Sequence, residues 1–417
     1  MSLIDQRLEI NVERFKADFD ALSQIGATNN DGVHRPALSQ NHLKARAWFR
    51  KRVTDADLVF QVDQAGNHSA ILPCQNNANT TLLIGSHLDS VPYGGRFDGA
   101  LGVLAALETL RVINENNINV PINLEAIDFT DEEGTLVNFM GSFALTGKLD
   151  KEGLDNPRGG HKEFETGLNR AGLAKSDILD ARRKPKTLAG YLELHVEQGP
   201  RLERAGADIG VVSSIAGICS YHVKFIGRED HAATIPMDDR LDAGLGASAF
   251  SLAAHQLVLR NYPECYVNVG NICYEPASFN IVPRKTTSSL EFRAPNSELM
   301  QQLRDALISK AEDAAEEHKL GIEIELLGDC APATMDEQLQ ELIVSSADYL
   351  GLKSLSLRSG PGHDAQAFAD LCPTGMIFAP SIDGASHSPR EKTSWNDCVN
   401  SANVLLHTTL QFISSKL

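Results

Sequence analysis

One stretch of the sequence constrains the fold more than any other, because it alternates strand-like and helix-like segments and places polar residues where each strand ends. A strand-like segment at residues 81–85 leads into a loop that carries His87. A helical pattern follows at residues 102–114, and a second strand-like segment at residues 122–129 ends in Asp-Glu-Glu at residues 131–133. Strand, helix and strand in this order are typical of a doubly wound α/β domain. In such domains the ligand site lies beyond the carboxyl ends of the strands.

The rest of the chain indicates a second domain. A length of 417 residues exceeds what one ordinary hydrophobic core supports. Residues 8–24 carry apolar positions at helical spacing, whereas residues 148–190 are rich in Gly, Lys, Arg and Asp, as in an excursion with short helices. After about residue 211 the pattern changes to strands near 211–213, 221–226, 267–272 and 287–293, with helices near 241–259 and 297–318. These segments predict a compact α+β domain.

We predict that this α+β domain interrupts the α/β domain, whose doubly wound sheet is expected to be mixed. The α/β domain would comprise residues 1–212 and 331–417, and the insert residues 213–330. The core domain is expected to resume after residue 330 because His387, a further candidate for the site, lies well beyond that point.

Composition excludes several classes of protein. Apolar residues make up 42% of the chain and charged residues 22%, as in an ordinary globular protein, and the net charge is -17. So acidic a chain is a poor partner for nucleic acids or anionic membranes. No apolar run approaches the roughly 20 residues that span a bilayer, and the first residues lack the pattern of a signal peptide. Seven scattered cysteines without a Cys-x-x-Cys pair indicate reduced thiols, so we expect a cytoplasmic location.

Five potential metal ligands stand in separate motifs, each where a strand or turn is expected to end: His87, Asp98, Glu133, His195 and His387. Three imidazoles and two carboxylates form a nitrogen and oxygen set that a pair of zinc-like divalent cations accepts. Asp98, followed by the flexible Gly99, is the natural bridging carboxylate. His87 and His195 would complete one metal site, and Glu133 and His387 the other. Two such ions share and activate a water, so the set indicates hydrolysis.

Two further carboxylates are predicted to act beside these ligands. Glu132 adjoins the proposed ligand Glu133, and we assign Glu132 as the general base that takes a proton from water and delivers it to the leaving nitrogen. Asp89 lies two residues after His87 and could hold the other ring nitrogen of that histidine. A lone histidine is seldom a ligand, and a Glu-Glu pair is usually a solvated face. The combination of all these motifs favours the metal site.

The motifs together resemble a known family. The segments that carry the resemblance are residues 85–99 (GSHLDSVPYGGRFDG), 128–134 (DFTDEEG), 195–199 (HVEQG) and 386–391 (SHSPRE). They are similar to the amidase, hydantoinase and carbamoylase branch of the dimetal M20 peptidase family, in matching order over about residues 80–400. The resemblance implies a catalytic domain with two zinc ions, or manganese, cobalt or nickel in their place. It also implies a dimerisation or lid role for the insert, and hence a homodimer.

The resemblance assigns substrate-binding roles to further residues. His195 stands where the aminopeptidases of the family usually have Asp or Glu, which favours ureido acids over peptides. Gln198 is similar to a substrate-contacting glutamine of the branch, and Asn280 to a substrate-binding asparagine. Arg293 matches the arginine that binds the substrate carboxylate, a role that suits its planar guanidinium. Taken without the resemblance, Arg293 could equally be a surface arginine on a strand.

The resemblance also suggests roles for His231 and for the loop at residues 359–365. His231 looks like the family histidine that reaches the active site of the neighbouring subunit and stabilises the oxyanion there. Ala233 and Ile235 depart from the family pattern near it. Residues 359–365 (SGPGHDA) resemble a Gly-rich substrate loop, with Pro361 where Ala is usual. Gly362 and His363 would contact substrate there, although for His363 a structural hydrogen bond to the loop is an equally good interpretation.

The expected activity is hydrolysis of the ureido C–N bond of N-carbamoyl-L-amino acids to the amino acid, carbon dioxide and ammonia. Allantoate amidohydrolase and β-ureidopropionase activities are close alternatives, because they share nearly all these residues. A dimetal aminopeptidase is a more distant one. A metal-free binding protein on the same fold is the alternative from another class, and it would be expected to have lost a ligand or the base.

Overall fold

The computed structural model describes residues 8–76 and 78–416, which form two compact units. The first unit comprises residues up to Ser213, Thr334–Ser359 and the segment from His363 onward. The second comprises Ser214–Ala333 and Gly360–Gly362. Within the described residues, no helix is long and apolar enough to cross a membrane.

The first unit is built around a nine-stranded mixed sheet with the order β1-β2-β4-β3-β5-β13-β6-β11, in which β12 also pairs with β6. Strands β4, β3, β5 and β13 run parallel to one another, whereas β1, β2 and β6 join antiparallel. The strands are β1 (Val59–Val62), β2 (His68–Leu72), β3 (Thr81–His87), β4 (Asn123–Phe129), β5 (Leu188–Val196), β6 (Ile209–Ile215), β11 (Ala333–Thr334), β12 (Ser354–Ser359) and β13 (Thr374–Ala379). The predicted α/β class with a mixed, doubly wound sheet is confirmed.

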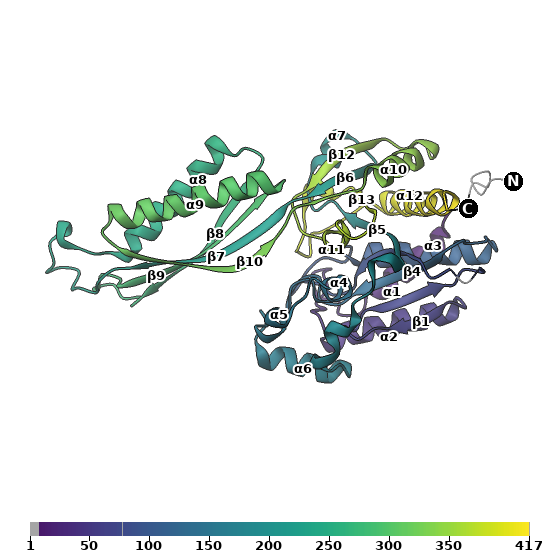
Figure 1. Ribbon diagram of the computed structural model, residues 1–417, viewed down its shortest axis with the longest axis horizontal. Helices are drawn as coiled ribbons and strands as arrows, with labels where there is room; N and C mark the ends of the chain where they lie inside the picture. Colours follow the sequence, from purple (N-terminus) through teal and green to yellow (C-terminus); the bar gives the residue numbers. More distant parts are fainter. Residues whose placement is uncertain (1–7, 77, 417) are drawn as a thin grey trace. The chain divides into compact units, whose positions relative to one another are not determined.

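Helices pack on both faces of this sheet (Figure 1). Helix α3, which is buried along almost its whole length, contacts β3, β4 and β5, and α12 packs against α3 and β13 in the same apolar core. On the other face, Phe368 of α11 stacks on Tyr191 of β5 with ring centroids 4.5 Å apart. The helices of this unit are α1 (Val12–Ser23), α2 (Gln40–Asp55), α3 (Ala100–Glu115), α4 (Met140–Thr146), α5 (Lys151–Asp155), α6 (His161–Ala171), α7 (Arg201–Ala205), α10 (Glu337–Tyr349), α11 (Ala365–Phe368) and α12 (Trp395–Ser414).

The parallel strands bring the predicted motifs to one edge of the sheet. Strand β3 ends at His87, β4 ends just before residues 131–133, and His195 is the second-to-last residue of β5. Strand β13 ends at Ala379, ahead of the loop that holds His387. Because neighbouring parallel strands end at the same edge, residues far apart in the sequence meet there.

The second unit is an antiparallel sheet with the order β10-β7-β9-β8, covered on one face by two helices (Figure 1). Alternate residues of β9 are buried, as expected for a sheet with one face against a core. The elements are β7 (Gly217–Ile226), α8 (Ala243–Asn261), β8 (Tyr266–Glu275), β9 (Lys285–Ala294), α9 (Ser297–Glu317) and β10 (Gly321–Cys330).

Candidate metal centre

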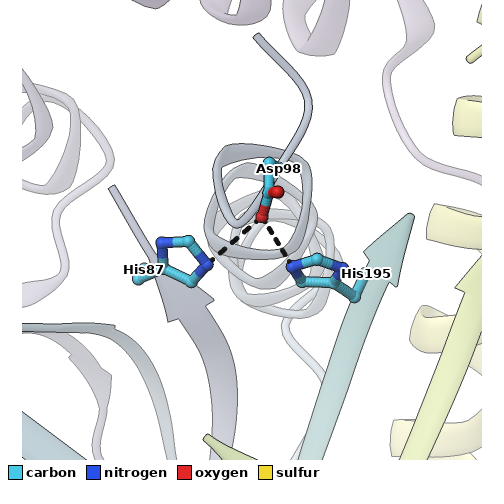
Figure 2. Close-up of side chains that lie close together, drawn as sticks. All are labelled: His87, Asp98 and His195. Carbon is cyan, nitrogen blue, oxygen red and sulfur yellow. Dashed lines mark ion pairs between the residues drawn. The ribbon is translucent and has the colours of Figure 1, made fainter. Parts of the chain in front are cut away.

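The first group of candidate ligands comes from three separate segments of the first unit. His87 lies at the end of β3, His195 near the end of β5, and Asp98 in the loop before α3. Asp98 Oδ1 lies 3.0 Å from His195 Nε2 and 3.5 Å from His87 Nε2, between the two imidazole rings (Figure 2). All three side chains are buried. Gly99 has a φ of +62°, and a Cβ there would lie 2.5 Å from the His87 ring, so only glycine fits behind Asp98.

A second group shares Asp98 with the first. Asp98 Oδ2 lies 3.5 Å from His387 Nε2, and that nitrogen lies 3.6 Å from Glu133 Oε2. Each group offers three ligand atoms within 4.8 Å of one another. The two oxygens of Asp98 therefore face different groups, as a bridging carboxylate does. His387 differs from the other four ligands because its side chain is 52% exposed.

The other ring nitrogens fix the tautomers of the buried histidines. His87 Nδ1 lies 3.0 Å from the main-chain oxygen of Asp89, and His195 Nδ1 lies 2.9 Å from that of Val196. An N–H at each Nδ1 leaves Nε2 with its lone pair directed at Asp98. Asp89 thus contacts His87 Nδ1, as predicted, but through its main-chain oxygen and not through its carboxylate. The Asp89 carboxylate lies 3.9 Å from Nδ1 and instead accepts from the Glu133 N–H at 3.3 Å.

The arrangement fits divalent cations. His87 Nε2 is buried and has no hydrogen-bond partner, a costly state for a polar atom that a cation would relieve. Ligands at 2.0–2.1 Å from a tetrahedral zinc ion are about 3.3 Å apart, close to the separations found here. Burial alone would lower the pKa of His87, but the carboxylates of Glu132, Asp98 and Asp89 hold that pKa well above its ordinary value.

Glu132 lies beside the first group, with Oε2 3.5 Å from His87 Nε2. Burial, together with the carboxylates of Asp364, Glu133 and Asp98, raises the pKa of Glu132 well above its ordinary value. A carboxyl group with a raised pKa is suited to accepting and returning a proton near neutral pH. Glu132 belongs to neither ligand group and so remains available for proton transfer.

Several residues that support these ligands were not singled out from the sequence. The peptide of Leu88, between His87 and Asp89, donates its N–H to Asp128 Oδ1 at 2.8 Å and accepts from Arg35 Nε at 2.7 Å. Asp128 is in turn paired with Arg46 at 2.9 Å, and both side chains are buried. Glu391 makes a further set of contacts with the Asp98 loop. Buried arginines and carboxylates carry no local sequence signal of their function, because their partners are distant in the chain.

Two of the predicted substrate residues contact the metal-ligand side chains directly. Gln198 Nε2 donates to Asp98 Oδ2 at 2.9 Å and to Ser386 Oγ at 3.0 Å. His363 is buried, shares a hydrogen bond of 2.9 Å with Ser359 Oγ, and its ring lies edge-on to that of His195, 4.5 Å away. These contacts favour the structural interpretation of His363, since its ring bonds Ser359 and packs against His195, a candidate ligand.

The remaining candidates lie in the second unit, which is described by itself. Arg293 on β9 donates to Glu291 Oε1 from two nitrogens, at 2.9 and 3.1 Å, and to the Gly360 oxygen at 2.9 Å. Gly362 belongs to the same short segment as Gly360. These contacts bring Arg293 next to the predicted Gly-rich loop.

His231 and Asn280 are neighbours in the second unit. Residues His231 and Ile281 form a β-bridge, and the Ala232 N–H donates to the Asn280 oxygen at 2.9 Å. Both His231 and Asn280 are exposed. His231 Nδ1 accepts from the Ala233 N–H at 3.1 Å, so Nε2 is the ring nitrogen left to donate. Ala233 thus retains the contact that orients the ring, although it departs from the family pattern.

A mixed α/β sheet whose parallel strands present histidines and carboxylates in two groups around a shared aspartate defines the class: a metal-dependent hydrolase. The chain belongs to peptidase family M20/M25/M40, whose pattern matches residues 83–411. The family resemblance read from the motifs is therefore confirmed. Members of this family are dimetal enzymes, in agreement with the two ligand groups.

Individual relatives narrow the class further. The chain is 34% identical to an N-carbamoyl-L-amino acid amidohydrolase of Geobacillus stearothermophilus, over 96% of this chain and 98% of that one. It is 30% identical to an allantoate amidohydrolase of Bacillus subtilis, over 93% and 95% of the two chains. A crystal structure of a hydantoinase/carbamoylase family amidase from Burkholderia vietnamiensis superposes with a TM-score of 0.86 at 32% identity, covering 98% and 99%. The chain is accordingly a hydrolase of the kind that acts on non-peptide C–N bonds.

Proposed function

We propose that this hydrolase cleaves the ureido C–N bond of N-carbamoyl-L-amino acids, releasing the amino acid and carbamate, which decomposes to carbon dioxide and ammonia. The observation that carries the proposal is the shared position of Asp98 between two ligand groups, with Glu132 beside them. His87, Asp98 and His195 would hold one cation, and Asp98, Glu133 and His387 the other. When bound, two divalent cations supply the Lewis acidity that activates water and polarises a carbonyl. Zinc suits these ligands, and manganese, cobalt or nickel are accepted by the same set.

The protein side chains then divide the proton transfer and the charge stabilisation. Glu132 takes a proton from the attacking water and returns it to the amino nitrogen as the bond to the carbamoyl carbon breaks. Asp89 holds His87 in the tautomer that leaves Nε2 for the cation. His231, donating from Nε2, stabilises the oxyanion that develops on the carbamoyl oxygen.

Five residues are the substrate contacts in this proposal. Arg293 binds the α-carboxylate, since a guanidinium fork pairs with two oxygens at once. Glu291 Oε1 accepts hydrogen bonds from two nitrogens of that guanidinium, so substrate binding would replace one carboxylate by another. Gln198, Asn280, Gly362 and His363 are the further substrate contacts that we propose, with His363 also supporting His195.

We also propose that the enzyme is a homodimer in which His231 enters the site of the second copy. Strand β8 lies at an edge of its sheet, where its outer backbone groups can pair with another strand. Next to it, α8 exposes Leu245, Leu252 and Leu259 at 47%, 70% and 65%, a stripe with the seven-residue spacing of helices that pack together. An exposed apolar stripe beside an open strand edge is typical of a surface that associates. Sedimentation of the purified protein and of Leu252→Glu tests this surface, because the variant should be monomeric.

The alternatives share the catalytic centre and differ in substrate. Allantoate amidohydrolase and β-ureidopropionase activities require the same centre and a carboxylate-binding arginine. A structure of aminopeptidase PepT from Bacillus cereus shares the fold at 18% identity, with a TM-score of 0.66, so the likeness to that aminopeptidase rests on the fold alone. His195, where the aminopeptidases have a carboxylate, favours the ureido acids.

The decisive experiment is ammonia release by protein loaded in parallel with zinc, manganese, cobalt or nickel. The substrates are N-carbamoyl-L-methionine, N-carbamoyl-β-alanine, allantoate and a dipeptide, the last assayed by free amino groups. Turnover of the carbamoyl amino acid, lost in Glu132→Gln, supports the proposal. Preference for N-carbamoyl-β-alanine or allantoate would favour one of the alternative activities. Cleavage of the dipeptide alone would overturn the proposal. Glu125→Gln is the matched control, because Glu125 is buried on β4 and bonds Ser69 and Arg183 away from the ligands.

A further inference from the structure

A buried carboxylate outside both ligand groups joins the two loops that carry Asp98 and His387. Glu391 Oε1 accepts from the N–H groups of Phe97 and Asp98, each at 3.0 Å. Glu391 Oε2 accepts from Ser386 Oγ at 3.2 Å, and that hydroxyl also lies 3.4 Å from Asp98 Oδ2. The side chain is 4% exposed. One carboxylate thus binds the residue before His387 and the main chain of Asp98.

The surrounding chain is shaped around this contact. A Cβ at Gly95 would lie 2.1 Å from Glu391 Oε1 and 2.5 Å from Glu391 Cβ, so the glycine lets the Asp98 loop approach. The Glu391 N–H donates to the Ser388 oxygen at 3.0 Å, which closes the turn after His387. His387 itself has a φ of +50°, a conformation that non-glycine residues adopt only when their surroundings hold them there.

Glu391 is placed to support a cation without binding it. Both of its oxygens accept hydrogen bonds from neutral donors, and among the described residues it belongs to neither ligand group. His87 and His195 sit on strands of the central sheet, so their positions are set by the fold. His387 sits on a loop and is half exposed, so its distance from Asp98 depends on what ties the two loops together.

We propose that Glu391 is a positioning residue that fixes the separation of Asp98 and His387 and thereby stabilises the second of the two cations. The inference rests on the proposed dimetal centre. It adds that binding of the cation between Asp98, Glu133 and His387 depends on Glu391. The hydrogen bonds of Glu391 carry the effect, since its charge is directed at N–H and O–H groups. Loss of partners that orient metal ligands typically costs about 10- to 100-fold in metal affinity.

The test measures metal binding, not turnover. Zinc stoichiometry and both dissociation constants are determined by competition with a chromophoric chelator for the wild-type protein, Glu391→Ala, Glu391→Asp and Glu391→Gln. In Glu391→Ala we expect the tighter site to be unchanged and the weaker one to lose about 10- to 100-fold in affinity. Glu391→Gln should keep both ions with affinities of the same order as the wild type. Its amide oxygen can accept the two N–H bonds, and its amide nitrogen can donate to Ser386.

Each outcome decides the proposal. The proposal is overturned if Glu391→Ala binds both zinc ions with the affinities of the wild-type protein. It is also overturned if Glu391→Gln loses the second ion, because the charge of Glu391 would then be the cause. If the alanine variant does not fold, Glu391→Asp takes its place: it keeps the charge but is shorter, so the weaker site should again lose affinity. Glu125→Ala is the control for removal of a buried carboxylate and should bind two ions. Fewer than two ions in the wild-type protein would instead overturn the dimetal centre itself.

Discussion

The candidate functional residues of the two units differ in how deeply they are buried and in how firmly they are held. In the first unit His87, Asp98 and His195 are buried, and each is fixed by ring or main-chain contacts. In the second unit His231 and Asn280 are exposed, and their side chains accept hydrogen bonds from residues two positions away in the chain. The difference indicates that the proposed metal centre is pre-organised by one core, whereas the proposed substrate residues of the second unit would gain partners only on binding. Changes in the two units should therefore affect different measured quantities.

The strongest way to break this comparison is to remove the shared ligand. Asp98→Ala deletes the carboxylate that both groups use, so both cations should be lost. We expect kcat to fall on the order of 10⁴-fold or more, because water activation disappears with the ions. His387→Ala, which touches only the second group, should retain one cation. Elemental analysis of the two variants beside their turnover checks this, and two ions in Asp98→Ala would contradict a bridging role.

The second unit should act on the chemistry only through His231. His231→Ala should lower kcat about 10²- to 10³-fold, as expected for loss of an oxyanion donor, with both cations retained. If His231 acts in the other subunit, mixing His231→Ala with Glu132→Gln should restore activity. Random exchange of equal amounts gives one intact site in half of the dimers, or about a quarter of wild-type activity.

The control for this mixing experiment is Glu132→Gln combined with the double variant Glu132→Gln/His231→Ala, which contains no intact site in any pairing. Activity in the control would indicate contamination. No recovery in the test mixture, despite subunit exchange shown by mass spectrometry, would mean that His231 does not work across the dimer.

Much of the first unit could be predicted because its signals are local. Apolar strands that lead into His87 and into the Asp-Glu-Glu of residues 131–133 predicted β3 and β4, and the helical pattern predicted α3 to within a few residues. Strand β5 was not predicted, because its first residues lie within the polar excursion that was assigned to residues 148–190. The ligands were predictable because their chemistry is unusual in combination.

The supporting residues could not be predicted, since their roles arise from contacts across the fold. Glu391 belongs to a recognised motif, yet its partners Phe97 and Asp98 lie almost 300 positions earlier in the chain. Arg35 and Arg46 belong to none of the recognised motifs, although both are buried. No periodicity or motif spacing records a hydrogen bond to a peptide group such as that of Leu88.

Substitution of the carboxylate-binding arginine should sharpen the comparison in the second unit. Arg293→Ala should lower kcat/KM for carbamoyl amino acids about 10- to 100-fold, mainly through KM, because charge-assisted hydrogen bonds are worth about 1.5–3 kcal/mol. Metal content should not change. Arg284→Ala is the control, since Arg284 is an exposed arginine of the same unit that pairs with Glu229. An equal loss for a substrate amide lacking the carboxylate would contradict the assignment.

The smallest effect concerns pH and a histidine of the first unit. Burial, with help from Arg46 and Arg50, lowers the pKa of His68 from 6.5 to about 2 in the folded protein. The unfolded chain binds a proton at His68 below about pH 6.5, whereas the folded one does not, so folding stability is full above that pH and falls as the solution is acidified. One such group contributes at most about 1.4 kcal/mol per pH unit.

His68→Gln should therefore flatten the loss of thermal stability between pH 7.5 and pH 5. His255→Gln, an exposed histidine on α8, should leave that slope as it is. The measurement is the melting temperature of the first thermal transition of each variant, with the metals removed so that ligand protonation contributes equally throughout. An unchanged slope in His68→Gln would mean that His68 becomes accessible to protons before unfolding. His42, another buried histidine of the first unit outside the ligand groups, would then be the next candidate for the acid sensitivity, because burial also lowers its pKa well below the ordinary value.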